Sequence, residues 1–377
     1  MKTAYETVMA AAVPAPSHWQ ESCVHSECTL HQLSPYIGKT KSIIARDLIL
    51  RYSSPGDLIV DPFCGSGTIA LEAVLRGRRA FAADVSAYAA VLARAKLNPP
   101  QSLDEALQMA EGAVHVPSRL RPSRNGAPKW VKRFFHPKTL GEALRFAAVC
   151  ERGEKDFLLA CFLGILHHQR PGFLSYPCSH LVPYLLDRKY PRSENPGLYK
   201  YRPLAPRLMA KVGRALRRLP VGLDRQAGRF HRSHIAELVF PRRFDCLITS
   251  PPYMNALDYG RDNRLRLWFV EPGSAAELDD VAVDSVEDFV ASLRLLARAC
   301  ERRMRPGGHC VLILGSKVHR SFEGHPSRVA FQAMRETAPS LRPVSAIIDH
   351  IPDVRRTRKR CRTNRMEHIL VFRRDPA

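Results

Sequence analysis

The turn Asp61–Gly67 has residue types that could hold a ligand carrying a ribose. Gly65 and Gly67 let the backbone pass close to a ligand where a Cβ would clash. The helix expected after this turn presents free N–H groups to the same point. Asp84 ends the next apolar run and is placed to accept hydrogen bonds from ribose hydroxyls. The turn matches neither GxGxxG nor a P-loop, and two glycines alone also fit a purely structural turn.

A second run, Thr249–Tyr253, suits chemistry on an exocyclic amine. Its two prolines fix the backbone, so that the Ser250 hydroxyl and the Pro251 carbonyl become rigid acceptors, and Pro252 has no N–H. Such an amine is a poor nucleophile because its lone pair is delocalised into the ring. Two aimed acceptors would hold its N–H groups and favour positive charge as the nitrogen attacks. Tyr253 could stack on the base. Taken alone, the tetrapeptide also fits a proline-rich loop.

The order and content of these runs resemble the amino-type DNA methyltransferases, which act on cytosine N4 or adenine N6. The segment Pro55–Thr68 contains their DPFxGSGT signature, and Ser250–Tyr253 is their SPPY loop. The resemblance implies S-adenosyl-L-methionine as cofactor and a base flipped from double-stranded DNA. It also implies DNA methylation of the restriction–modification kind. It assigns catalysis to Ser250, Pro251, Pro252 and Tyr253, and cofactor binding to Tyr36, Asp61, Pro62, Phe63, Cys64, Gly65, Ser66, Gly67, Thr68 and Asp84.

Two segments depart from the family pattern. Residues 36–42 resemble the segment that closes over the methionine end of the cofactor, but Lys41-Ser42 stands where many relatives have Lys-Pro. Ser233-His234 stands where relatives usually carry an acidic residue against the adenine. These departures concern individual cofactor contacts rather than the class of enzyme.

The residue before the two prolines bears on the target base. Ser250 is commoner among cytosine-N4 enzymes and Asp among adenine-N6 enzymes, so we expect cytosine N4. Adenine N6 is the first alternative, and an RNA base amino-methyltransferase is the second, although those enzymes usually show Asn or Asp here. A DNA-binding protein that has lost turnover is a third, against which the intact SPPY loop argues.

Short apolar strands alternate with segments of helical periodicity. Expected strands are at 57–60, 79–84, 244–249, 308–314 and 368–372, and expected helices at 42–52, 68–76, 87–97, 156–168 and 286–304. The opening order predicts an α/β fold with a doubly wound, mostly parallel sheet. By resemblance this is a Rossmann-like S-adenosylmethionine-dependent methyltransferase.

The strand pattern stops near residue 100 and resumes near 229. We therefore expect an irregular N-terminal leader at 1–35, a catalytic domain formed by 36–100 and 229–377, and an inserted, largely helical, basic region at 101–228. The leader lacks the long apolar stretch of a signal peptide, and no run is long enough to span a membrane, so we expect a cytoplasmic protein.

Charge points to a polyanionic partner. The 377 residues include 58 Lys and Arg against 36 Asp and Glu, a net charge of +22. Eight basic residues fall in 117–145 and thirteen in 187–233, each with few acids, and 355–362 is a further basic cluster. We expect 101–228 to be a target-recognition region that tracks DNA phosphates. Its aromatic residues Trp130, Phe134 and Phe135 could pack within the protein or wedge into the DNA.

The ten cysteines form no CxxC pair, so neither a zinc ribbon nor a disulfide framework is indicated. The cluster Cys23, His25, Cys28 and His31 fits no zinc-finger spacing, and we expect no metal. Pro177-Cys178 lacks the other motifs of cytosine-C5 enzymes, so that Cys178 is expected to be structural.

Overall fold

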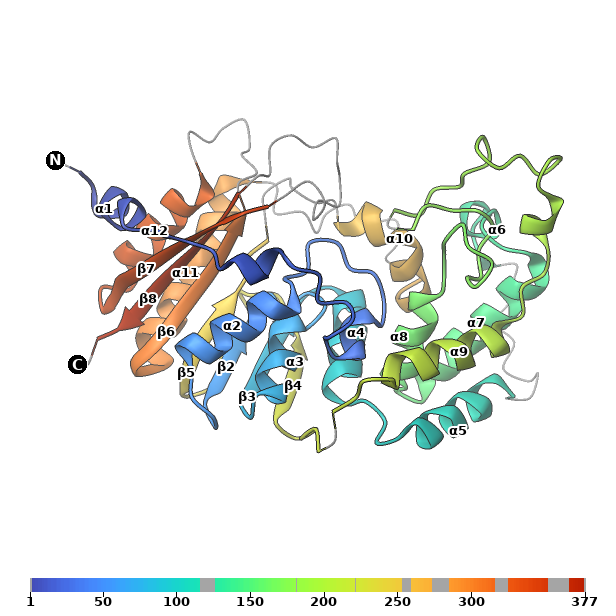
Figure 1. Ribbon diagram of the computed structural model, residues 1–377, viewed down its shortest axis with the longest axis horizontal. Coiled ribbons are helices and arrows are strands. Elements are labelled where there is room, and N and C mark those ends of the chain that lie inside the picture. The colour runs from blue at the N-terminus through green and yellow to red at the C-terminus, as the bar shows by residue number, and fades with distance from the viewer. Residues whose placement is uncertain are drawn as a thin grey trace.

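The computed structural model describes residues 2–115, 126–180, 182–220, 222–252, 259–272, 285–315, 325–351 and 366–375. Several predictions lie outside the described residues: Tyr253, the rest of its loop to residue 258, Arg119, Arg121 and Arg124, and the basic cluster 355–362. Within the described part, one sheet occupies one end of an elongated molecule, and a helical region occupies the other (Figure 1).

Eight described strands form this sheet in the order β1-β7-β8-β6-β5-β2-β3-β4. Their bounds are β1 Val13–Pro14, β2 Leu58–Asp61, β3 Arg79–Asp84, β4 Gly228–Arg232, β5 Phe244–Thr249, β6 Met304–Gly315, β7 Leu341–His350 and β8 Met366–Arg374. Every neighbouring pair is parallel except for the two that contain β8. This confirms the expected α/β class with a mostly parallel sheet.

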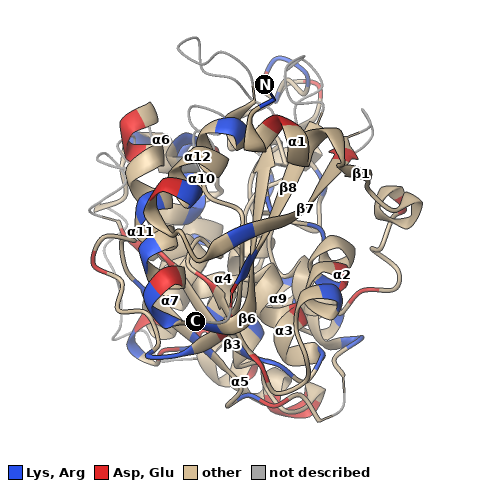
Figure 2. Cartoon of the chain, turned by 90° about the vertical axis from the view of Figure 1, so that its left-hand side faces the viewer, with Lys and Arg blue, Asp and Glu red and all other residues tan. Residues whose placement is uncertain are grey.

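Helices cover both faces of the sheet, as the edge-on view in Figure 2 shows. On one face lie α2 (Ser42–Tyr52), α3 (Thr68–Leu75) and α4 (Ala87–Leu97). On the other lie α11 (Val286–Arg303), α12 (Pro326–Thr337) and the short α1 (Ala4–Ala10). The apolar residues of the strands alternate accordingly: Ile59 packs with the first set of helices, and Val60 with the second. The sheet is therefore doubly wound.

The elements predicted within 36–100 and 229–377 are present with small shifts at their ends. The helices expected at 42–52 and 87–97 are α2 and α4, and the strand expected at 244–249 is β5. Gly77, at φ +71°, lies just beyond the end of α3, as its position in the sequence predicted.

The N-terminal segment differs from the expected irregular leader. Helix α1 begins with a capping box between Thr3 and Glu6, and β1 pairs with β7 at the edge of the sheet. Trp19 is fully buried, and its indole N–H donates to Asp47 on α2 at 2.8 Å. Burial of a large aromatic ring thus anchors a segment whose local sequence has little helical or strand periodicity.

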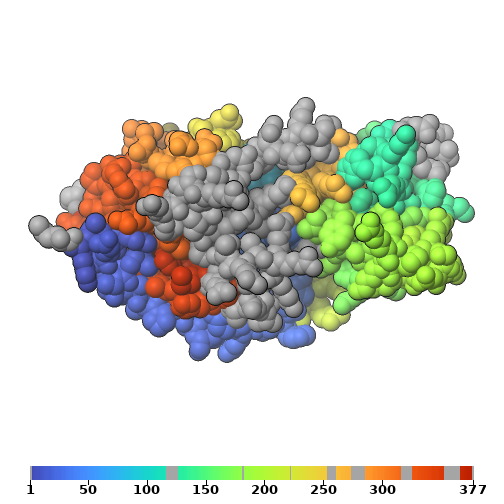
Figure 3. All heavy atoms as spheres, turned by 90° about the horizontal axis from the view of Figure 1, so that it is seen from above, coloured from blue at the N-terminus to red at the C-terminus, as the bar shows by residue number. Residues whose placement is uncertain are grey.

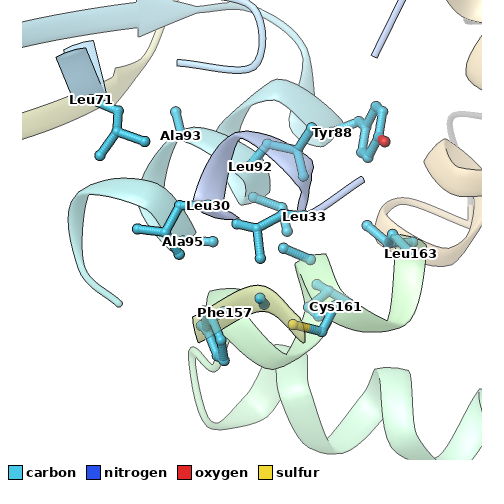
Figure 4. Packing of buried hydrophobic residues seen from close by; sticks show 14 of the residues in the cluster. Leu30, Leu33, Leu71, Tyr88, Leu92, Ala93, Ala95, Phe157, Cys161 and Leu163 are labelled. Atoms are coloured by element: carbon cyan, nitrogen blue, oxygen red, sulfur yellow. The ribbon is translucent and has the colours of Figure 1, made fainter. Parts of the chain in front are cut away.

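The described residues between α4 and β4 include the α-helices α5 (Leu103–Val114), α6 (Lys129–Lys132), α7 (Pro137–Arg152), α8 (Asp156–Gly164) and α9 (Leu204–Leu216). Helix α8 packs against α4 through Phe157, Cys161 and Leu163, with Leu30 and Leu33 of the N-terminal segment in the same cluster (Figure 4). The helical region therefore shares a continuous core with the sheet.

Seen from above, this helical region (green) lies at the opposite end of the molecule from α12 and α1 (Figure 3). Helix α10 (Tyr259–Val270) bridges to it, because α10 contacts both α4 and α7. Trp130 packs against the Trp268 ring of α10 and Phe135 against its Phe269 ring, and Phe134 contacts both Trp130 and Phe135. They are thus packing residues.

Among the described helices, none is long and apolar enough to cross a membrane.

Candidate active site

A cavity of about 500 Å³ lies at the carboxyl ends of strands β2, β3, β4 and β5. We call it the sheet-edge pocket. The predicted residues that line it are Tyr36, Asp61, Pro62, Phe63, Cys64, Gly65, Ser66, Thr68, Asp84, Ser250 and Pro252. Its volume lies in the range of small-molecule sites, roughly 300–1,000 Å³. Both predicted loops therefore face one cavity.

The loops meet because β2 and β5 are parallel neighbours. Ile59 pairs with Cys246, and Val60 with Leu247, so both strands end at the same edge of the sheet. The Thr249 hydroxyl at the end of β5 donates to Asp61 Oδ1 at 2.7 Å, across 188 residues of sequence. Both side chains are buried, and this hydrogen bond fixes the start of one loop to the start of the other.

Backbone geometry in the first loop requires its two glycines. Gly65 has φ +49°, and a Cβ there would lie 3.1 Å from the Tyr36 ring. Gly67 has φ +72° as the N-cap of α3, and a Cβ would meet Ala93 of α4 at 3.0 Å. Gly67 itself does not line the sheet-edge pocket. The structure gives it a positioning role that brings α3 close to α4.

Asp84 is held by the loop that it faces. Its carboxylate accepts from Gly65 N at 2.8 Å and from Ser86 N at 2.9 Å. Burial raises the pKa of Asp84 above its ordinary value, and these backbone N–H donors counteract that rise. A carboxylate oxygen has two lone-pair directions, so the group can still accept from hydroxyls of a ligand.

Burial strongly affects two charged groups under the same loop. It raises the pKa of Asp61 to about 7, against the lowering effect of the Thr249 hydrogen bond. Lys96 of α4 is buried and donates to the Ser66 carbonyl. Burial, aided by the charge of Lys39, lowers the pKa of Lys96 to about 7. The pocket floor is thus built from polar groups taken out of water.

The second loop is only partly described. Ser250 and Pro252 line the sheet-edge pocket, whereas Pro251 is buried and does not. The side chain of Tyr253 lies outside the described residues.

The closing segment also lies at the pocket. The Tyr36 ring stacks on Tyr88, with centroids 5.7 Å apart, and the Tyr88 hydroxyl donates to Pro35 O at 2.6 Å. Lys39 lines the pocket and donates to His31 O at 2.8 Å. The Lys41 ammonium, in contrast, donates to Trp19 O and Glu21 O. Lys41 therefore anchors the N-terminal segment.

Sequence reasoning missed one wall of the pocket. Asp288, Ala291, Ser292 and Leu295 of α11 line it, and their spacing of three and four places them on one helix face. The amino-acid sequence shows that these four residues share a helix face, but it does not show that this face lies against the edge of the sheet. Residues 233–236, directly after β4, line the pocket next to Asp84.

The other residues weighed for chemistry have structural contacts. His31 is buried, and its Nε2 is hydrogen-bonded to Glu72 Oε1 at 2.8 Å, whereas Cys23 contacts Glu27 and Ser42. Cys178 is buried, and burial raises the pKa of its thiol to about 12. No group of three or more possible metal ligands occurs in the described ranges.

A comparison of the chain with protein families matches residues 17–94 to the DNA methylase family N6_N4_Mtase. This segment contains the first loop and Asp84. The match is to the same family as the one that the DPFxGSGT resemblance predicted.

Among curated proteins, the Type II methyltransferase M.MjaII of Methanocaldococcus jannaschii is 32% identical to this chain over 68 residues. The match covers 18% of this chain and 13% of that protein. The chain thus spans only a small part of the length of this relative.

Two of the solved structures to which the chain was found similar have TM-scores below 0.5. TrmN from Thermus thermophilus has a TM-score of 0.36 at 11% identity, covering 92% of this chain and 52% of that one. A putative DNA modification methylase from the same organism, complexed with S-adenosyl-L-methionine, has a TM-score of 0.23 at 20% identity, covering 38% of this chain and 50% of that one.

Proposed function

We propose that the protein transfers a methyl group from S-adenosyl-L-methionine to an exocyclic amino group of a DNA base, with cytosine N4 as the favoured target. The observation that carries the proposal is the shared pocket. A loop of the DNA methylase family and a Ser-Pro-Pro loop from a distant part of the chain line one cavity, joined by the hydrogen bond between Thr249 and Asp61.

The donor half of the pocket fits the cofactor. Gly65 brings backbone close to the cavity, and Asp84 offers a carboxylate to ribose hydroxyls. The apolar side chains of Val85 and Ile235 line the pocket near Asp84, where they suit the flat face of an adenine ring. When bound, the cofactor supplies a methyl group on a sulfonium centre, whose positive charge favours ionised Asp61 nearby.

The acceptor half would orient the amine. The Ser250 hydroxyl would accept one N–H group at the pocket wall, and the Pro251 carbonyl would accept the other after a movement of this buried residue toward the pocket, so that the nitrogen lone pair faces the methyl carbon. Attack by this nitrogen would form the N–C bond as the C–S bond breaks, with S-adenosylhomocysteine as the leaving group, and the amine would then release one proton to solvent. No covalent bond to the protein is needed. Tyr253 would stack on the flipped base and offset part of the cost of unstacking.

The catalytic unit in this proposal comprises 36–100 and 229–377, and the helical region 101–228 reads the DNA. The net charge of +22 supports a nucleic-acid partner. Adenine N6 stays the alternative base, because Ser250 is only correlated with cytosine, and an RNA base is the second alternative.

Transfer of tritium from labelled cofactor tests the proposal. Duplex DNA and RNA of the same sequence are incubated with the protein, digested to nucleosides and separated. The expected product is N4-methylcytosine from DNA. N6-methyladenine from DNA would replace cytosine by the alternative base, and label in RNA alone would refute DNA as substrate.

A further inference from the structure

A second cavity, of about 800 Å³, lies between residues 32–39 and helices α8 and α9. We call it the basic groove, after its cationic lining residues Lys39, Arg170, Arg207, Lys211 and Arg214. Tyr36 and Lys39 line both this groove and the sheet-edge pocket, so the two cavities share a wall.

The basic groove has no carboxylate in its described lining. Across the described ranges, none of its five cations forms an ion pair with Asp or Glu. Glu27 and Glu142 are close enough to influence the pKa values of Lys39 and Arg207, but each lies beyond ion-pair distance. The five positive charges around this cavity therefore have no carboxylate partner in direct contact within the described ranges, and such a surface attracts anions.

Two lysines converge on adjacent carbonyls at the groove. Lys39 donates to His31 O at 2.8 Å, and Lys211 donates to Gln32 O at 2.7 Å. Burial, with the charges of Arg214 and Lys39, lowers the pKa of Lys211 to about 8. Lys39 keeps access to solvent, but the protein packed around it removes part of its hydration and so lowers its pKa as well. An anion between the two ammonium groups would relieve this repulsion.

The arginines differ in how they are held. Arg207 is fixed, because it donates to Pro171 O at 3.0 Å and to Pro203 O at 3.0 Å. Arg170 and Arg214 are exposed, and within the described part of the chain their guanidinium groups have no hydrogen-bond acceptor. They can therefore turn toward a ligand at little cost.

Between the charges, part of the groove wall is apolar. Tyr36, Ile165 and Phe173 line it, and the Phe173 ring lies against His168 with centroids 4.6 Å apart. Gly172 adds no side chain. Cations beside aromatic rings form the pattern that binds a single nucleic-acid strand, since phosphates meet the charges and bases stack on the rings.

We propose that the basic groove binds the sugar–phosphate backbone of the DNA strand that carries the target base, beside the flipped nucleotide. This inference rests on the proposed function. The shared wall at Tyr36 places the groove next to the cavity where that nucleotide would react. Phosphates of a strand entering there would lie between the two lysines and within reach of Arg170 and Arg214.

The test compares two double variants of equal net charge. Arg170→Gln/Arg214→Gln removes the unpaired groove arginines, and Arg51→Gln/Arg298→Gln removes two exposed arginines that also lack ion pairs in the described structure. Binding to duplex DNA and to single-stranded RNA of the same sequence is measured over a range of salt concentrations. Melting temperature and binding of labelled S-adenosylmethionine check the fold.

For DNA, the plot of the logarithm of the association constant against the logarithm of the salt concentration has a negative slope. The groove variant should make this slope shallower by about two, one for each phosphate that the protein no longer neutralises. The control variant should change that slope much less, and both should bind cofactor normally. If the groove variant matches the control on DNA, or loses affinity only for RNA, the groove assignment is overturned while the proposed function stands. If the wild type methylates no DNA although it binds cofactor, the proposed function fails, and the groove assignment fails with it.

Discussion

The sheet-edge pocket and the basic groove share Tyr36 and Lys39 but have opposite charge. Asp61, Asp84 and Asp288 line the pocket, where Lys39 is the one Lys or Arg in the described lining. The groove has five cations and no acid among its described residues. A pocket rich in carboxylates suits ribose hydroxyls and a sulfonium, whereas the groove suits phosphates. The wall formed by Tyr36 and Lys39 separates two ligand chemistries, and the following substitutions test that separation.

The largest effect is expected at the acceptor loop. Ser250→Ala should reduce methyl transfer roughly 10²- to 10³-fold, as removal of one aimed polar group does in other active sites, and should leave cofactor affinity unchanged. Ser292→Ala removes a hydroxyl of the same pocket that α11 carries, and should change transfer only a few-fold. Single-turnover rates with labelled cofactor measure both. A normal rate for Ser250→Ala would contradict the assigned role.

Asp84→Asn should come next, because it weakens the donor half of the pocket. Removing hydrogen bonds to a charged acceptor costs about 1.5–3 kcal/mol, so the Kd for S-adenosylmethionine should rise roughly 10- to 100-fold. Titration calorimetry measures this change. Asp104→Asn, on the exposed first turn of α5, should leave the Kd unaltered. Equal affinity in the two variants would remove Asp84 from the binding site.

A smaller effect is expected from the link between the loops. Thr249→Val leaves Asp61 Oδ1 buried without its hydroxyl donor, and should lower the free energy of unfolding by about 1–3 kcal/mol. Thr249→Ser retains the donor and should recover most of that stability. Urea unfolding at constant pH gives both values. If Val and Ser behave alike, the hydrogen bond contributes little to joining the loops.

The smallest effect, counted per pH unit, is the pH dependence that Asp61 gives to the free energy of unfolding. Its pKa is about 7 in the folded protein against an ordinary value of 3.8, so between these pH values the folded state holds a proton that the unfolded chain has released. The free energy of unfolding therefore falls as pH rises from about 4 to about 7, by at most about 1.4 kcal/mol per pH unit.

Asp61→Asn should flatten this slope, which chemical unfolding at several pH values measures. Lys96 acts with the opposite sign and in another window. Because its folded pKa is about 7 and its ordinary value 10.5, it makes stability rise with pH above 7. An unchanged slope below pH 7 in Asp61→Asn would mean that Asp61 is ionised in the folded state.

The sequence predicted the parts of the catalytic domain whose signals are local. Helix α2 follows from its spacing of apolar residues, and the first loop from its glycines beside a short apolar strand. The adjacency of β2 and β5 depends on pairing across 188 residues, for which no local pattern exists, and the prediction there rested on family resemblance. Strand β7 was missed because Pro343, Ser345 and Asp349 interrupt its apolar pattern.

The helical region shows the same limit. The sequence carries start signals for α5 and α7 in the Ser102 N-cap and in Pro137 at the first turn, but it does not show how these helices pack together. The basic groove could not be predicted, because its residues come from 32–39, 165–180 and α9, which only the tertiary fold brings together.

The most direct test of the central claim is nucleoside analysis by mass spectrometry of DNA from a host that lacks this activity, expressing either the wild type or Ser250→Ala. The account predicts N4-methylcytosine with the wild type and its near absence with the variant. DNA that carries no methylated amino group, from cells in which the wild-type protein is folded and binds S-adenosylmethionine, would contradict it.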